Sequence, residues 1–170
     1  MQGLLHRPVR TYDPGRELLA NEHFQVAYVT GDLDRAAAAF ARRFAIRDFA
    51  DLEGEMPAGG YIRVKLAWVG GIMYELIQCT GPGSDMYNGQ LPDEGFAIRF
   101  HHLGFLVADQ SSWDALQSRI EADGWAVPQA NNTPGFMRHC YIEVPELGHF
   151  CEYIFPEQAG VEFFERVPAS

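Results

Sequence analysis

The sequence is poor in cysteine, in basic residues and in long apolar runs, and each shortage excludes a class of protein. Its three cysteines, Cys79, Cys140 and Cys151, contain no CxxC pair, so we expect buried, reduced thiols rather than a zinc knuckle or a disulfide framework. Only 13 basic residues stand against 23 acidic ones, for a net charge of −10. Because no basic cluster is present to neutralise phosphates, we expect no nucleic-acid partner.

Long apolar runs are absent as well. No stretch approaches the roughly 20 apolar residues of a membrane span, and residues 1–15 lack the apolar segment of a signal peptide. The composition, 47% hydrophobic and 13% aromatic over 170 residues, is nevertheless sufficient for a packed core. We therefore expect a soluble, cytoplasmic protein of one large domain or two small modules, with no membrane partner.

The first half of the chain predicts a strand, a helix and three more strands. Segment 23–30 alternates and is rich in β-branched and aromatic residues, which is typical of a strand. Thr30 or Asp32 can cap the following helix, whose apolar residues over 33–44 recur at a spacing of three and four. The remaining elements expected here are strands at 46–49, 61–69 and 72–78, the last two joined by a turn at Gly70-Gly71.

The second half repeats this order after a glycine- and proline-rich connection over 79–97. A strand is expected at 100–107 and a helix from Ser111 or Ser112 to Gly124. Strands at 125–127, 136–144 and 149–155 complete the repeat. The predicted fold is therefore α+β, with two tandem βαβββ modules that form one U-shaped mixed sheet. The expected boundaries are an N-terminal arm (1–22), a first module (23–79), a connecting loop (80–98), a second module (99–155) and a C-terminal tail (156–170).

The repeat has a register of 77 residues. Gln25 and His102 are separated by this distance, and so are Glu75 and Glu152. The same offset relates Asp32 to Asp109 and Gly71 to Gly148. Residue identity elsewhere between the halves is low, but an offset shared by these particular positions favours a duplication.

The repeated polar positions predict a metal site. Gln25 and His102 lie on the first strand of each module and Glu75 and Glu152 on the last, so a pseudo-twofold pairing of the modules would bring the four together. One amide oxygen, one imidazole and two carboxylates suit a divalent ion such as Zn²⁺, Ni²⁺, Fe²⁺, Mn²⁺, Co²⁺ or Mg²⁺. Taken singly, each glutamate could face solvent and His102 could be structural. His23 shares a face with Gln25 and is an alternative ligand, whereas His101 points away from His102.

Four segments resemble the vicinal oxygen chelate superfamily, which includes glyoxalase I, methylmalonyl-CoA epimerase, extradiol dioxygenases and bleomycin-resistance proteins. These segments, QVAYVTGDLDRA, MYELIQCTGPG, FHHLGFLVAD and GHFCEYI, occur in order within residues 23–155. The similarity is greatest to the branch near methylmalonyl-CoA epimerase and glyoxalase I. It implies paired βαβββ modules around a metal held by Gln25, Glu75, His102 and Glu152, a set of residue types that matches glyoxalase I.

The resemblance also implies a mechanism. The metal would stabilise the enolate formed when a substrate loses the proton next to a bound carbonyl, with Glu152 as the general base and Glu75 as the alternate. Glyoxalase I has an arginine where this chain has Val29, which argues against glutathione substrates. Extradiol dioxygenases use two histidines and one carboxylate, and Gln25 occupies the first histidine position.

Substrate contacts are expected on two polar strand faces. Arg63 and Lys65, opposite an apolar face of the same strand, and His139 are candidates for holding an anionic group, and Tyr87 is a candidate lid residue. The predicted function is a metal-dependent isomerase, epimerase or lyase acting on a small molecule. An extradiol-type dioxygenase and a ligand-sequestering protein of the bleomycin-resistance kind are the alternatives. We expect a homodimer, with the N-terminal arm reaching a partner; the metal site lies either within one chain or across the dimer.

Overall fold

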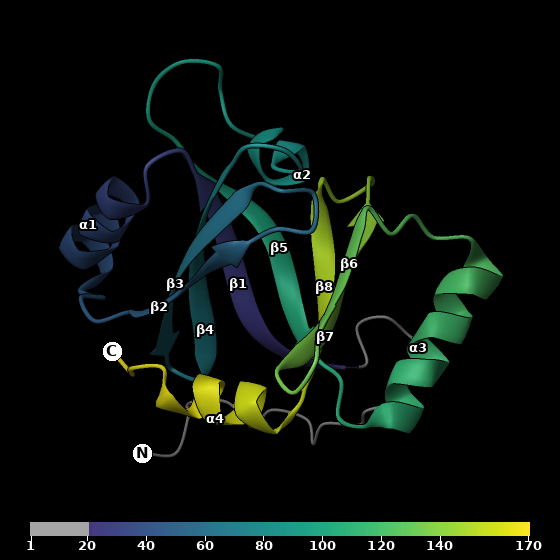
Figure 1. The fold of residues 1–170 in the computed structure, drawn as a ribbon. Coiled ribbons are helices and arrows are strands. Elements are labelled where there is room, and N and C mark those ends of the chain that lie inside the picture. Colours follow the sequence, from purple (N-terminus) through teal and green to yellow (C-terminus); the bar gives the residue numbers. More distant parts are fainter. Residues whose placement is uncertain (1–20) are drawn as a thin grey trace.

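A computed structural model describes residues 21–170, in which eight strands form one curled sheet with two helices on its outer face (Figure 1). The elements of the first half are β1 (Glu22–Thr30), α1 (Leu33–Phe44), β2 (Ala50–Glu55), β3 (Tyr61–Val69), β4 (Ile72–Thr80) and α2 (Asp85–Asn88). Those of the second half are β5 (Ile98–Leu106), α3 (Gln110–Asp123), β6 (Gln129–Thr133), β7 (Met137–Val144), β8 (His149–Pro156) and α4 (Gln158–Arg166).

The strand order is symmetric about the centre of the sheet, reading β2-β3-β4-β1-β5-β8-β7-β6. β1 and β5 pair antiparallel at this centre, and each pairs parallel with the last strand of its own half, β4 or β8. Replacing each strand by its equivalent in the other half gives the same order read from the opposite edge of the sheet, as a pseudo-twofold axis requires. The predicted fold class, two βαβββ units sharing one mixed sheet, is confirmed.

The 77-residue register is visible in equivalent structural roles. Asp32 and Asp109 are the N-caps of α1 and α3, and their side chains accept hydrogen bonds from the backbone amides of Arg35 and Ser112. Gly71 and Gly148 both adopt positive φ in the hairpin turns, at 88° and 68°, where glycine carries no steric penalty. The expectation that Ser111 or Ser112 opens the second helix is wrong, because Asp109 performs that role.

Two expected strands, at 46–49 and 125–127, are also wrong. The structure places strands later, at Ala50–Glu55 and Gln129–Thr133. Ile46 and Phe49 pack in the cluster beneath α1, and Trp125 packs with the cluster beneath α3. Both segments are thus apolar because they fill the space between helix and sheet, whereas the true edge strands are polar and lack the apolar alternation that marks a strand.

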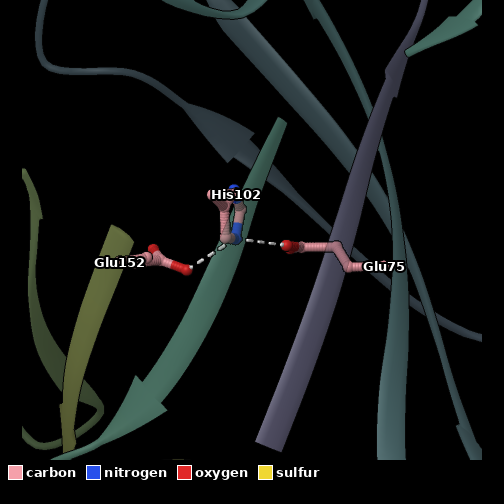
Figure 2. Close-up of side chains that lie close together, drawn as sticks. All are labelled: Glu75, His102 and Glu152. Carbon is pink, nitrogen blue, oxygen red and sulfur yellow. Dashed lines mark ion pairs between the residues drawn. The ribbon is translucent and has the colours of Figure 1, made fainter. Parts of the chain in front are cut away.

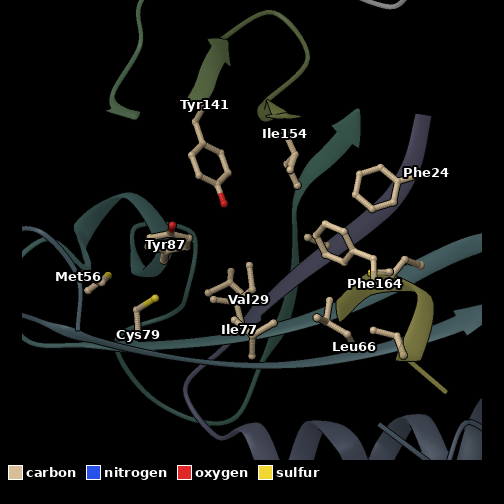
Figure 3. Packing of buried hydrophobic residues seen from close by; sticks show 14 residues of the cluster. Phe24, Val29, Met56, Leu66, Ile77, Cys79, Tyr87, Tyr141, Ile154 and Phe164 are labelled. Atoms are coloured by element: carbon tan, nitrogen blue, oxygen red, sulfur yellow. The ribbon is translucent and has the colours of Figure 1, made fainter. Parts of the chain in front are cut away.

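The core lies on both faces of the curled sheet. Outside, α1 packs against Ala67 and Leu76, and α3 packs against Cys140 and Ile142. Inside, residues from both halves form one cluster, shown in Figure 3. α4 closes one end of the sheet (Figure 1) and inserts Phe164 into this cluster.

Two of the expected connecting segments contain helices that the sequence did not predict. The C-terminal tail contains the helix α4, and the connecting loop contains the short helix α2. Of the expected N-terminal arm, residues 1–20 lie outside the described part of the chain, and Glu22 already belongs to β1. Within residues 21–170, no helix is long and apolar enough to cross a membrane.

Replacing the cap of α3 will test its assignment. We expect Asp109→Ala to lower the free energy of unfolding by about 1 kcal/mol, because the amide of Ser112 loses its acceptor. Ser111→Ala is the matched control, since the exposed Ser111 hydroxyl only donates to Asp109, and its change should stay within about 0.5 kcal/mol. Urea unfolding followed by circular dichroism measures both. A larger loss in Ser111→Ala would contradict the assignment.

Candidate metal centre

Glu75 of β4, His102 of β5 and Glu152 of β8 meet on the concave face of the sheet, with the two carboxylates on opposite sides of the imidazole (Figure 2). His102 Nε2 lies 3.2 Å from Glu75 Oε2 and 3.0 Å from Glu152 Oε2. The three ligand atoms lie within 4.8 Å of one another. All three come from one chain, so the described residues form this cluster without a partner subunit.

Two small residues allow side chains from non-adjacent strands to meet. In the sheet, Ala27 of β1 lies between Glu75 and His102, and Gly104 of β5 lies between Gln25 and Glu152. A Cβ built on Gly104 would lie 2.4 Å from Gln25 Oε1, so only glycine leaves room for that amide. Ala27 and Gly104 are also 77 residues apart. Sequence reasoning missed both residues, although a glycine inside a strand can indicate such a close approach.

Gln25, the fourth expected ligand, lies at the edge of the cluster. Its side chain is buried, and its Oε1 is 3.4 Å from His102 Nε2. The alternative ligand, His23, is not brought there. A β-bulge follows His23, its Nε2 contacts the backbone oxygen of Gln25, and its ring packs on Phe105. The bulge breaks the alternation that would have put both residues on one face.

Burial and mutual charge set the protonation of the cluster. Burial alone would lower the pKa of His102, but the charge of Glu152 and hydrogen bonds to both glutamates raise it to about 9. Burial raises the pKa of Glu75. Burial has the same tendency at Glu152, yet the charge and hydrogen bond of His102, with a hydrogen bond from Tyr141, hold its pKa below the usual range. Glu152 is therefore the carboxylate that stays ionised most readily.

His101 fixes the orientation and tautomer of His102. His101 Nε2 lies 3.2 Å from the carbonyl oxygen of Met86, which can only accept, so this nitrogen carries a proton. Burial lowers the pKa of His101 to about 3, so the ring is neutral and its Nδ1 is an acceptor. His102 Nδ1, 2.9 Å away, must then be the donor. In neutral His102 this leaves the Nε2 lone pair facing Glu75 and Glu152, as a metal ligand requires.

The residues present fit a divalent ion. Glu75 Oε2 is buried and competes with Glu152 Oε2 for the single Nε2–H of His102, at 3.2 Å and 3.0 Å, so one N–H cannot satisfy both carboxylates. An ionised carboxylate oxygen in this position is costly unless a cation lies beside it. Two carboxylates, an imidazole and a nearby amide oxygen are ligands that Zn²⁺, Ni²⁺, Co²⁺, Fe²⁺, Mn²⁺ and Mg²⁺ accept to different degrees. The donor set thus agrees with the predicted cofactor, and the ion itself is unidentified.

A change at His101 tests its role in holding the ligand. We expect His101→Phe to weaken metal binding by about 10- to 100-fold, because His102 Nδ1–H loses its acceptor. His101→Gln is the matched control, since its amide can still accept that proton, and it should bind within a few-fold of the original protein. Calorimetric titration with Zn²⁺, Ni²⁺ and Mn²⁺ measures the affinities. Equal weakening in both variants would show that His101 acts only through packing.

The four expected substrate contacts divide into two groups. His139 and Tyr87 line a cavity of about 330 Å³ that also contains Gln25, Glu75 and Glu152. Tyr87 is buried and stacks on His101 at 5.0 Å, so it forms part of the wall rather than a lid.

Arg63 and Lys65 lie on the other face of β3, where they pair with Glu53 and Asp51 of β2. The expected orientation of this strand is therefore wrong. Its apolar face, which includes Ile62, Val64 and Leu66, forms the cavity wall. α1 contacts the outer face of β3 at Ala67 and Val69, so Arg63 and Lys65 lie half-buried beside β2 and not beneath a helix.

Comparison with solved structures identifies the fold. Methylmalonyl-CoA epimerase from Mycobacterium tuberculosis matches with a TM-score of 0.58 and 17% identity, covering 83% of this chain and 91% of that one. A variant of the Streptomyces coelicolor methylmalonyl-CoA epimerase in complex with 2-nitronate-propionyl-CoA has a TM-score of 0.56 and 16% identity, covering 80% of this chain and 97% of that one. A hypothetical protein from Bacillus halodurans C-125 has a TM-score of 0.56 and 10% identity, covering 81% and 96%.

No protein-family model matches the chain, and no curated protein matches its sequence. The chain shares the fold of methylmalonyl-CoA epimerases, which is the fold that the resemblance of the four segments implied. At such identities the comparison establishes the fold, and function has to be argued from the site.

Proposed function

We propose that this protein is a metal-dependent isomerase, epimerase or lyase that removes a proton next to a carbonyl group of a small molecule. The observation that carries the proposal is the buried cluster of Glu75, His102 and Glu152, in which two carboxylates share one imidazole nitrogen at the wall of a cavity. The epimerase neighbours support the same class of chemistry.

The divalent ion would polarise the substrate carbonyl and so acidify the neighbouring C–H group. Glu152 is the base that we assign to this proton, because its carboxylate lies at the cavity wall and the resemblance to glyoxalase I places the base at this position. Burial keeps the pKa of Tyr141 well above its usual range, so the hydroxyl stays protonated and donates to Glu152. This hydrogen bond orients the carboxylate.

Glu75 faces Glu152 across His102 (Figure 2). Carboxylates on both sides of a planar enolate can remove a proton from one face and return it at the other, which is the requirement of an epimerase. Return of the proton by the same carboxylate to the neighbouring carbon would instead give an isomerase, and loss of a leaving group from the enolate would give a lyase. Glu75 is therefore the alternate acid–base residue in this proposal.

The dioxygenase alternative loses its main support. It needs two histidines and one carboxylate, and His23 is held by the Gln25 backbone and Phe105. A sequestering protein of the bleomycin-resistance kind would bind a ligand in the same cavity without catalysing a reaction. Metal-loaded protein, incubated in D₂O with α-hydroxy ketones and 2-substituted acyl thioesters and followed by NMR, separates the two. Metal-dependent deuterium uptake supports the enzyme, and tight binding without uptake would replace it with the sequestering protein.

We propose that the protein is a homodimer and that it is located in the cytoplasm. The exposed side chain of Phe44 and the apolar residues Leu18 and Leu19, which lie outside the described residues, are candidates for contact with a partner. We expect light scattering to give twice the mass of one chain for the full protein, and a shift toward one chain after deletion of residues 1–20. A single-chain mass for the full protein would contradict the dimer.

A further inference from the structure

The cavity beside the candidate metal centre has a mainly apolar wall, and the charged residues of that wall are four glutamates, Glu53, Glu55, Glu75 and Glu152. Its volume of about 330 Å³ is at the small end of the range for ligand sites. Apolar side chains from both halves of the chain surround it, namely Leu52, Met56, Ile62, Val64, Leu66, Phe136, Met137, Ile154 and Phe164. Several of them appear in Figure 3, where Tyr87 and Tyr141 lie among apolar side chains.

No lysine or arginine is among the described residues that line this cavity. The nearest candidates by sequence, Arg63 and Lys65, are on the outer face of β3 and already pair with acidic residues. Arg138 of β7 also faces outward, over the rings of Trp113 and Phe155. A substrate carboxylate or phosphate placed here would thus meet Glu75 and Glu152 without a lysine or arginine of residues 21–170 in the wall to offset them.

One polar atom of the wall remains free to select a ligand. His139 Nε2 is buried without a hydrogen-bond partner, and His139 lines the cavity. Burial lowers the pKa of His139, so the ring is neutral. A neutral imidazole nitrogen can bind a hydroxyl or carbonyl oxygen of a ligand, and it adds no charge that would favour an anion.

We infer that the substrate is an uncharged, largely apolar carbonyl compound with a second, neutral oxygen near the carbonyl. This inference rests on the proposed function, because it takes the metal-bound carbonyl from it. It separates this chain from its structural neighbours, one of which binds 2-nitronate-propionyl-CoA.

Matched pairs of probes test the inference. The first pair is 2-hydroxy-1-phenylpropan-1-one and its 4-carboxylate, which share the reacting carbon and differ in one charge. The second pair is the N-acetylcysteamine thioester and the coenzyme A thioester of one 2-methyl-branched acyl group. We expect metal-dependent deuterium uptake to be at least about tenfold faster for the uncharged member of each pair, which corresponds to about 1.4 kcal/mol.

Two variants distinguish charge from shape. Leu52→Lys places a cation on the cavity face of β2 and should raise the rate of the carboxylate probe several-fold. Asp51→Lys adds a cation to the same strand outside the cavity lining, on the face where Asp51 contacts Lys65, and should leave the ratio of rates unchanged.

A third variant tests the role of His139. Propiophenone is the matched probe, because it keeps the phenyl ketone and lacks the second oxygen. His139→Phe should weaken the apparent affinity for the hydroxy ketone about tenfold, since the hydroxyl loses its buried partner. The apparent affinity for propiophenone should not change. Equal weakening for both ketones would show that His139 acts on the shape of the cavity alone.

The outcomes also separate this inference from the proposed function. Uptake that is equal or faster with the charged members would overturn the inference and leave the function standing. If no probe exchanges, the proposed function fails, and calorimetric binding of the same pairs still decides the ligand class. Tighter binding of the uncharged members would then support the inference, and equal or tighter binding of the charged members would overturn it.

Discussion

His102→Ala protein is expected to carry no stoichiometric divalent metal after purification without added ions, whereas the original protein carries about one ion per chain. His102 is fully buried between Glu75 and Glu152, and its Nε2 is the only nitrogen among the grouped ligand atoms. Without it, two carboxylates and an amide remain, and binding of Zn²⁺ or Ni²⁺ loses the donor that those ions favour. Plasma emission analysis of the metal-to-protein ratio measures the change.

Two controls accompany this experiment. His23→Ala removes the histidine that the sequence offered as an alternative ligand, and it should keep the original metal content because His23 contacts the Gln25 backbone and Phe105 instead. Glutamine occupies most of the volume of the histidine side chain, which alanine leaves empty. A loss of metal in a folded His102→Gln protein is therefore caused by the missing imidazole and not by a cavity at this position. Normal metal content in His102→Gln and in His102→Ala would refute the assigned centre.

Loss of proton exchange in Glu152→Gln is the second large effect that we expect. The substitution keeps the size of the side chain and removes the base, so the metal-dependent exchange rate should fall by about 10²- to 10⁴-fold. NMR in D₂O with the fastest-exchanging probe measures the rate, with the metal content determined on the same sample. Because Glu152 is also a predicted ligand, rates are compared at saturating metal.

Glu75→Gln and Glu143→Gln complete the comparison. Glu143 is exposed on the neighbouring strand β7, so its amide variant should exchange at the original rate. Full activity in Glu152→Gln with loss in Glu75→Gln would transfer the role of base to Glu75. Loss of exchange with one substrate stereoisomer in Glu152→Gln, and with the opposite stereoisomer in Glu75→Gln, would agree with a proton removed by one carboxylate and returned by the other.

Much of the fold follows from local signals. The apolar alternation of β1 and β5, the helical spacing in α1, and the turn at Gly70-Gly71 depend on neighbours in the chain, and all of these elements were predicted close to where they lie. The polar edge strands β2 and β6 were missed because each pairs on one side only and has little apolar pattern.

The fold class could be predicted from the sequence alone, and so could the four polar positions that the sheet places on one face, through the 77-residue register. A repeated offset indicates a symmetric structure, and symmetry constrains which residues can meet. The way in which they meet depends on packing between distant parts of the chain. The bulge after His23, the space over Ala27 and Gly104, and the His101 hydrogen bonds depend on strands far apart in the chain. Which face of β3 lines the cavity also depended on packing, because an alternating strand does not specify which of its two faces a helix will cover.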